Sequence, residues 1–481
     1  MQSAIRINRA DGQVDKPSKH NLAFAGLFFF TLLLYLRPNE TFPQLFGTFP
    51  IVKIVAIITL LAYCASKLGL AERLTIWPLE LKMLALITFL GIAFIPIAAS
   101  PKDSIEVLTD TFLKVVTIFI LMINLLNTRE RLRSIMRLVV ICGTVLALLA
   151  ILSYIEGKFT VVTKGEEGTV VALRITGAVG GVFGNPNDLA TSLDLLIPLA
   201  VALAMTRRGL ARAAYFACAV FLAIGVVVTF SRGGFLGLVT AAGLMLWKIG
   251  RRNRALTAIS FVFVLGVFMV VMPSGYSSRI TSIFDTSSDP TGSSQERRDL
   301  LERAKDVASN HLIFGVGMGN YPMYSLHERR AHNSFLEISA ELGVMGLIAY
   351  LIMVFAPLRS LRRIGRETSP PRNTFAAADH DDGRQETYYL SAAFHASLVV
   401  YLICSCFGSI QYLWFLYYPL AYAISIRRIH EAESLAASEL PAKMKVVEAR
   451  PRAVLWKPRQ LRKPRPTLPA IAGDYDAPTN S

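Results

Sequence analysis

Arg232 lies between two apolar runs, in a short segment where two glycines follow it. About 36 residues separate Arg212 from Lys248, which gives roughly 54 Å of helix against the roughly 60 Å that two upright bilayer crossings require. Arg232 is therefore expected to be recessed at the outer edge of the membrane, where an uncompensated cation is costly. Its guanidinium either snorkels to lipid headgroups or is held ready for an anion, with the glycines letting backbone approach closely.

His332 stands where a long polar loop re-enters an apolar run. Asn333 or Ser334 can cap the helix that starts there, and His332 itself could be an interfacial or capping residue. An imidazole at the membrane entry, on the same side as Arg232, can also be neutral at neutral pH and accept a proton from a hydroxyl. The position thus favours a general base without excluding the structural role.

A third polar segment begins at Arg174 and runs through glycine-rich sequence to the apolar run that starts near Asp188. Asn187 or Asp188 can cap the helix that begins there, and this would be a purely structural role. The residues alone leave open whether the segment also contacts a substrate.

Arg297 and Arg298 open the segment Glu296–Leu312, whose apolar side chains recur at helical spacing. This pattern predicts an amphipathic helix lying on the membrane face or over a cavity. The glycines of the segment Gly315–Asn320 have no strand–helix context and are expected outside the cell membrane, so a dinucleotide site is not predicted. They are interpreted as hinges of a mobile lid.

Four charged residues fall within apolar runs, namely Lys53, Asp110, Lys114 and Asp194. Asp110 and Lys114 are four residues apart and can pair on one helix face. Proton-coupled transport usually depends on such residues, so a transporter is retained as an alternative, although no inverted repeat is evident.

Membrane-spanning helices must position these groups. The 481 residues are 53% hydrophobic and 17% charged, too apolar for soluble domains of ordinary size. Runs of roughly 20 apolar residues recur along the chain, which predicts an all-α integral membrane fold with about 12 transmembrane helices. The expected crossings are Asn21–Leu36, Pro50–Ser66, Met83–Ala99, Ile105–Leu126, Ile135–Tyr154, Leu189–Met205, Ala213–Thr229, Phe235–Trp247, Leu256–Met272, Phe335–Leu358, Leu390–Cys406 and Tyr412–Ile426.

Lys and Arg gather in alternate loops, which the positive-inside rule places in the cytoplasm. The net charge of +16 is thereby explained without a nucleic-acid partner. The five cysteines all fall in apolar runs, so neither disulfides nor a cysteine metal site is expected. The predicted organisation begins with a cytoplasmic N-terminus at 1–20 and continues with a membrane domain at 21–426. The membrane domain is expected to have periplasmic loops at about 155–188 and 273–333 and a cytoplasmic insert at about 359–388. A basic, Pro-rich cytoplasmic tail at 427–481 is expected to be disordered and can touch anionic lipid.

Several of these strings together resemble the motifs of one superfamily, that of the bacterial O-antigen ligases and the O-antigen and exopolysaccharide polymerases. The strings are Asn185–Asn187, Ser231–Gly234, the Arg298 helix ending at Gly315–Gly317, and His332–Asn333 followed by Glu341–Gly343. The similarity covers roughly residues 50–420, with the motifs concentrated in 174–347. It implies a GT-C-type glycosyltransferase of the bacterial inner membrane with its active site facing the periplasm, where the large loop carries the amphipathic helix.

The resemblance implies a donor glycan on undecaprenyl pyrophosphate and an acceptor that is either another lipid-linked glycan, for a polymerase, or the lipid A core, for a ligase. It implies no cofactor. The catalytic residues carried over by the motifs are His332, Arg232 and Arg298. The implied substrate-binding residues are Arg174, Asn185, Asn187, Arg297 and Asn333.

The chemistry of the residues agrees with these roles. A pyrophosphate leaving group develops negative charge, which guanidinium groups stabilise through bidentate, charge-assisted hydrogen bonds. The sequence places no paired outward carboxylates or histidine clusters for a divalent metal, so arginines are expected to replace the metal. His332 would deprotonate the acceptor hydroxyl, and a single displacement would invert the anomeric centre. We favour polymerisation of O-antigen or exopolysaccharide, with ligation onto lipid A core, or transport of a polysaccharide or lipid-linked glycan, as alternatives.

Overall fold

The computed structural model describes residues 20–38, 44, 51–158, 161–164, 170–175, 181–249, 293–369 and 382–439. The chain forms two units, 1–435 and 436–481, and the helices and strands belong to the first apart from the end of the last helix. The predicted crossing Leu256–Met272 and the start of the second long loop lie outside the described residues.

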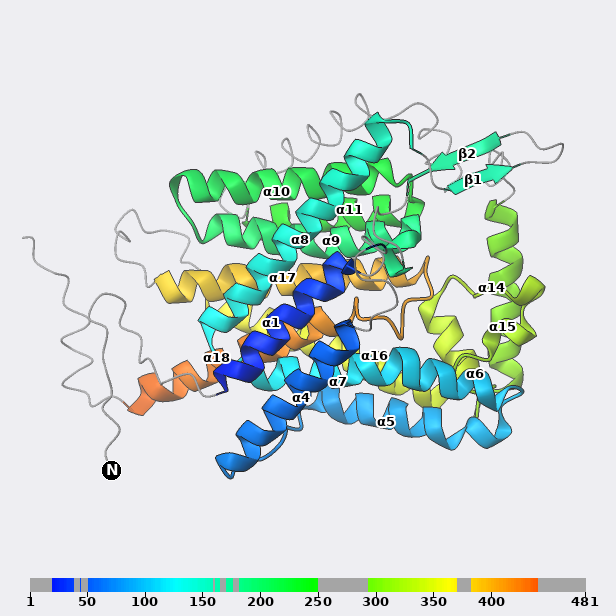
Figure 1. Cartoon of the computed structure of the whole chain (residues 1–481), viewed down its shortest axis with the longest axis horizontal. Coiled ribbons are helices and arrows are strands. Elements are labelled where there is room, and N and C mark those ends of the chain that lie inside the picture. Colours follow the sequence, from blue (N-terminus) through cyan, green and yellow to red (C-terminus); the bar gives the residue numbers. More distant parts are fainter. Residues whose placement is uncertain are drawn as a thin grey trace, which may run out of the picture. The chain divides into compact units, whose positions relative to one another are not determined.

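Most of the described chain is helical (Figure 1). The α-helices are α1 (Asn21–Leu36), α4 (Ile51–Gly69), α5 (Leu79–Ala93), α6 (Pro101–Glu106), α7 (Leu113–Leu125), α8 (Arg129–Ile155), α9 (Pro186–Met205), α10 (Gly209–Val228), α11 (Arg232–Ile249), α14 (Ser293–Asn310), α15 (Tyr321–Tyr324), α16 (Ser334–Glu367), α17 (Asp382–Ser405) and α18 (Tyr417–Glu439). A π-helical segment, Val107–Phe112, joins α6 to α7, and short 3-10 turns occur at Ile95–Ile97, Gly181–Gly184 and Leu326–Glu328.

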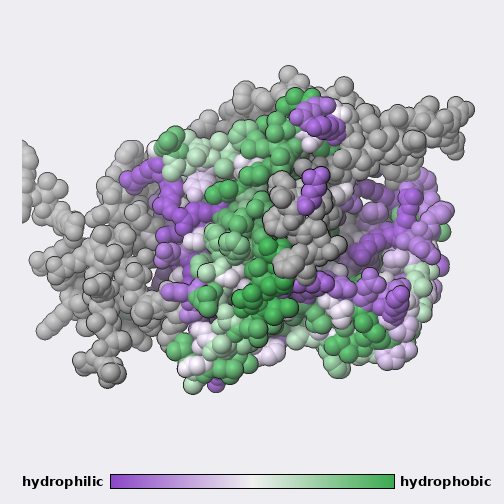
Figure 2. Space-filling model, in the orientation of Figure 1, coloured by the Kyte–Doolittle hydropathy of each residue, from purple (hydrophilic) through white to green (hydrophobic). Residues whose placement is uncertain are grey.

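Among the described helices, seven are long and apolar enough to cross a membrane. They are α4, α5 with the 3-10 turn after it, α8, α9, α10, α16 and α17. The predicted crossings at α1, α7, α11 and α18 are also helical, but these helices are shorter or more polar. On the face drawn in Figure 2, hydrophobic side chains form a broad band with hydrophilic side chains on both sides of it, as expected of a surface that faces lipid. The chain is thus a polytopic membrane protein.

The all-α prediction missed one small sheet. Strands β1 (Val161–Lys164) and β2 (Val170–Arg174) form an antiparallel pair in which Val161 lies opposite Arg174. Both strands are rich in valine, a β-branched residue that favours extended backbone. The sequence predicts a glycine-rich loop here, but the two pairs of adjacent valines lie in extended backbone.

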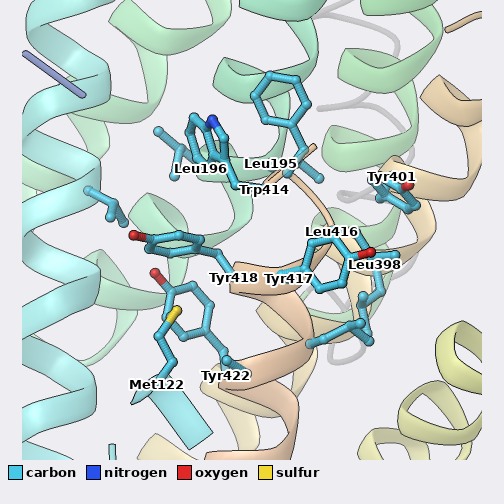
Figure 3. Close-up of a cluster of buried hydrophobic side chains, with 14 of the residues drawn as sticks. Met122, Leu195, Leu196, Leu398, Tyr401, Trp414, Leu416, Tyr417, Tyr418 and Tyr422 are labelled. Carbon is cyan, nitrogen blue, oxygen red and sulfur yellow. The ribbon is translucent and has the colours of Figure 1, made fainter. Parts of the chain in front are cut away.

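Helix α9 lies at the centre of the bundle, in contact with α8, α10, α11 and α17. Beside it, α1, α9 and α18 enclose a buried aromatic cluster (Figure 3). Trp414 packs edge-on against Tyr35 and Tyr418, with ring centroids 5.1 and 5.5 Å apart. Aromatic pairs of this geometry add to the stabilisation from burial. The cluster holds in place the connection between α17 and α18, which carries Trp414.

Elsewhere in the bundle, charged residues of different helices form ion pairs. Glu386 of α17 pairs with Arg129 and Arg133 of α8. Arg427 of α18 pairs with Glu80 of α5 at 2.8 Å. This helix continues to Glu439, so the prediction of a disordered tail from 427 is wrong for its first residues. The reason is that charged side chains at the helix end find partners on the bundle, which their composition does not reveal.

Candidate functional site

The starts of α9 and α11 are joined by direct hydrogen bonds. The Ser231 hydroxyl donates to Oδ1 of Asn187 at 2.9 Å and accepts from the Gly234 amide at 3.1 Å, so it caps α11. Asn185 caps α9 by accepting from the Asn187 amide at 2.8 Å. The capping role therefore belongs to Asn185, which leaves Asn187 to connect the two helices. Arg232, the first residue of α11, is half-buried beside this junction.

The start of α16 is capped by Asn333, as the sequence allowed. Its Oδ1 accepts from the amides of Phe335 and Leu336, both at 3.0 Å, and its Nδ2 donates to the Cys406 carbonyl at 3.5 Å. The capping side chain thus also reaches the loop between α17 and α18, residues 406–411, which is called the connecting loop below.

The connecting loop links α16 to α11. The Ser334 hydroxyl donates to the Gly408 carbonyl at 2.7 Å and accepts from the Ile410 amide at 2.9 Å. On its other side, a Cβ at Gly233 would lie 3.0 Å from Cβ of Phe407. Glycine suits this position because a larger residue would require α11 or the loop to shift. The starts of α9, α11 and α16 therefore converge on one region, and three helix N-termini present partial positive charge to it.

His332 directly precedes this capped start and has a left-handed backbone conformation, with φ of 51°. This conformation costs a residue with a side chain about 1–2 kcal/mol, so the surrounding contacts must hold it. Burial, followed by the charges of Arg297, Arg329 and Arg330, lowers the pKa of His332 from 6.5 to about 4. The imidazole is therefore neutral at neutral pH and lies among cations.

The structure separates the two arginines that open α14. Arg297 is half-buried and acts electrostatically on His332, whereas Arg298 is exposed and is not among the groups that shift that histidine. Arg329 forms an ion pair with Glu296, which ties the loop before His332 to the start of α14. Arg330 acts on His332 and also on Asp188 in the first turn of α9. Arg174 ends β2.

Helix α14 confirms the predicted amphipathic helix, and its apolar face is covered by protein. Leu300, Ala304, Val307 and Ala308 are buried, and the last three form a cluster with residues of the 316–340 region. The hydroxyl of Tyr321 donates to the Leu300 carbonyl at 3.2 Å. Helix α14 and α15 lie beside the first half of α16 (Figure 1), so α14 is held over the site by packing.

The glycines after α14 fill a break in α16. At Gly343, φ is 66° and the helix is interrupted. The chain at 312–317 enters the break: the Val344 amide donates to the Leu312 carbonyl at 2.7 Å, and the Gly317 amide donates to the Glu341 carbonyl at 3.0 Å. A Cβ at Gly315 would overlap that same carbonyl. The glycines interpreted as lid hinges are thus sites of close packing.

Reasoning from the sequence missed Arg329, Arg330 and Glu337. A sequence signal for Glu337 was present, because it is four residues after Asn333 and so shares its helix face.

Among the described residues, no group of three or more His, Cys, Asp and Glu side chains could hold a metal ion.

The fold and the site define an integral membrane protein whose helix starts and arginines surround a neutral histidine. Residues 217–351, which include Arg232, Arg297, Arg298 and His332, match the O-antigen ligase family. This match covers 135 of the 481 residues and supports the resemblance to the superfamily of O-antigen ligases and polymerases that the motifs indicate. Enzymes of this family are glycosyltransferase-like ligases and polymerases. No curated protein matches the sequence.

Proposed function

We propose that this protein transfers a glycan from undecaprenyl pyrophosphate to a sugar hydroxyl at the periplasmic face of the bacterial inner membrane, in the polymerisation of O-antigen or exopolysaccharide. The observation that carries the proposal is the neutral imidazole of His332, placed beside Arg297 and Arg330 where three helix starts converge. A transfer from pyrophosphate needs both parts of this arrangement, a base for the acceptor and positive charge for the leaving group.

In the proposed reaction His332 accepts the proton of the acceptor hydroxyl as its oxygen attacks the anomeric carbon. The bond between that carbon and the phosphate oxygen breaks, and the pyrophosphate leaves with the electron pair. One displacement inverts the configuration of the anomeric carbon. A positioned base contributes typically about 10²–10⁴-fold to such a step.

The charge that develops on the pyrophosphate is stabilised by Arg232 and by the arginines that open α14. Planar guanidinium groups bind phosphate oxygens in pairs, and helix N-termini add backbone dipoles of the right sign. Arg297 is the arginine of α14 with an electrostatic effect on His332, while the motif resemblance names Arg298. We assign Arg297 to the reacting phosphate and keep Arg298 as a candidate for a more distal contact. Asn185, Asn187, Asn333 and Arg174 would line the substrate path.

Polymerase and ligase differ in the acceptor. A transporter is less well supported, because Asp110 and Lys114 pair with each other at 2.9 Å on an exposed helix face. The test is purified protein in detergent or liposomes with lipid-linked glycan as donor. A new glycosidic bond of inverted configuration, formed in the presence of EDTA, supports the proposal. Strict metal dependence would contradict the role of the arginines. Glycan movement across a sealed membrane without bond formation would favour transport.

The acceptor is decided in cells. A deletion strain that accumulates single lipid-linked repeats, and makes no polymer, identifies a polymerase. A strain with free polymer and uncapped lipid A core identifies a ligase.

A further inference from the structure

Glu337 lies in the first turn of α16, and its side chain is 1% exposed. One carboxylate oxygen accepts from the Ala331 amide at 3.1 Å and from the Ser409 hydroxyl. The other accepts from Nε2 of Gln411 at 3.0 Å and lies 3.8 Å from Nη1 of Arg330. A single buried carboxylate thus contacts both the chain that precedes His332 and the connecting loop.

The partners of Glu337 all offer hydrogens. An amide, a hydroxyl, a side-chain amide and a guanidinium surround the two oxygens, and this is the environment of an ionised carboxylate, which can only accept. Burying a charge is costly unless it is paired and hydrogen-bonded. A glutamine in place of Glu337 could still accept some of these hydrogen bonds through its side-chain oxygen. The negative charge of Glu337 therefore matters most for its contact with Arg330, which is its one charged partner.

Two of the four contacts involve Arg330 and Ala331, the two residues that precede His332 in the sequence. Ala331 is bonded through its backbone amide, immediately before the left-handed residue, and Arg330 is held through its side chain. The Arg330 side chain is 47% exposed. Its Nη1 lies near Glu337 and also donates to the Ser409 carbonyl at 3.4 Å. Within the described residues, Nε and Nη2 of Arg330 make no hydrogen bond or ion pair.

We propose that Glu337 is the positioning residue of this site, which holds His332 in its strained backbone conformation and aims Arg330 at the phosphates of the donor. The proposal rests on the function proposed above. It makes Arg330 a further phosphate-binding residue, anchored at one nitrogen and open at the others, as a planar guanidinium that binds an anion must be.

Glu337→Gln tests the charge, and Glu341→Gln is the matched control. Glu341 is one turn further along α16 and equally buried, and it accepts from Tyr412 at 2.7 Å and from the Tyr321 amide at 3.4 Å. Its only interaction with residues 330–332 among the described contacts is a longer-range electrostatic one with Arg330, without a hydrogen bond or ion pair. Glu337→Gln is expected to lower kcat about 10- to 100-fold, as for other residues that orient a reacting group, and to raise the donor KM. Glu341→Gln is expected to leave the donor KM unchanged in folded protein. Equal effects of the two variants on donor KM would overturn the proposal.

A cycle with Arg330→Ala separates the two contacts. The rise in donor KM should be the same in Arg330→Ala and in the double variant, because Glu337 affects KM only through Arg330. The loss in kcat caused by Glu337→Gln should persist in the Arg330→Ala background, since it acts through Ala331 and His332. Additive effects on KM would show that Arg330 is not the route.

Labelling of histidine with diethyl pyrocarbonate, located by mass spectrometry, needs no turnover. His332 should be modified several-fold faster in Glu337→Gln than in wild type, because its restrained loop is released, and His327 serves as an internal reference. If wild type forms no glycosidic bond but this rate rises, the proposed function fails and the positioning role stands. An unchanged rate, whether or not the protein is active, overturns the positioning role.

Discussion

The pH below which activity is lost should depend on Arg297 and not on the adjacent Arg298. His332 must be neutral to accept a proton, so activity is present above its pKa and is lost as the pH falls through it. Burial, and then Arg297, Arg329 and Arg330, lower this pKa to about 4. The acid limb of kcat/KM, which reports the free enzyme, is therefore expected near pH 4 in wild type.

The magnitude follows from the pKa. A fall from 6.5 to about 4 disfavours the imidazolium by about 3 kcal/mol, at about 1.4 kcal/mol per pH unit. Burial is the largest cause and remains in an Arg297→Gln variant, so only part of the fall is reversed. Removing one nearby cation should raise the pKa of His332, and with it the acid limb, by about 1 pH unit. Arg298→Gln removes an equal charge one residue away, at an exposed position.

The assay is the rate of glycan transfer at low donor concentration between about pH 3.5 and 8, with folding checked at each pH. Arg297→Gln should move the acid limb of kcat/KM to higher pH. Arg298→Gln should leave the pH of that limb unchanged, whatever its effect on the rate. A shift in Arg298→Gln alone would reverse the assignment of the two arginines. An acid limb that persists in the residual activity of His332→Ala would remove His332 as the titrating base.

Three further outcomes are expected. His332→Ala should lose about 10²–10⁴-fold in turnover yet still retain donor lipid in a pull-down, and wild-type turnover would refute the base. Arg232→Ala should abolish glycan transfer at normal membrane expression. Arg232→Lys should rescue it only partly, because an ammonium group cannot form the paired hydrogen bonds that a planar guanidinium makes with phosphate. Full activity of Arg232→Ala would remove Arg232 from the site. Gly343→Ala should destabilise the protein by at least about 2 kcal/mol, measured by thermal unfolding in detergent, since its φ is 66° and its Cβ would lie 2.5 Å from the Ile313 carbonyl. Gly69→Ala, with open space around it, is the control.

The sequence was most informative where the structure depends on apolar length. Within the described residues most of each predicted crossing is helical, although the one predicted at Tyr412–Ile426 is helical only from Tyr417. The apolar spacing at 300–308 located the buried face of α14. It was least informative where backbone groups determine the structure. The connecting loop holds α16 through carbonyls and one amide of residues 406–410, and any sequence carries such groups. For the same reason the break at Gly343 could not be inferred from an apolar run that continues through it.

Arg297 and Arg298 show a second limit of prediction from the sequence. Consecutive residues on a helix point about 100° apart, so only one of two adjacent arginines can face a given neighbour. The motif could not say which, because the choice depends on how α14 is rotated about its axis. Its buried residues, Leu300, Ala304 and Val307, fix that rotation. Arg297 lies one turn before Leu300 and two turns before Ala304, on the same side of the helix.

A pKa of about 4 makes His332 a weak base in the free protein, and two of the three arginines that lower it, Arg297 and Arg330, are proposed to bind the donor. A bound pyrophosphate would offset the positive charge of Arg297 and Arg330, which removes part of the electrostatic cause of the low pKa. The imidazole would then become a stronger base once the donor is in place, while burial still keeps it neutral. The acid limb of kcat, which reports the donor complex, should consequently lie at higher pH than the limb of kcat/KM. In Arg297→Gln part of that charge is already absent, so the gap between the two limbs should narrow; an unchanged gap would mean that the donor phosphates do not reach this arginine.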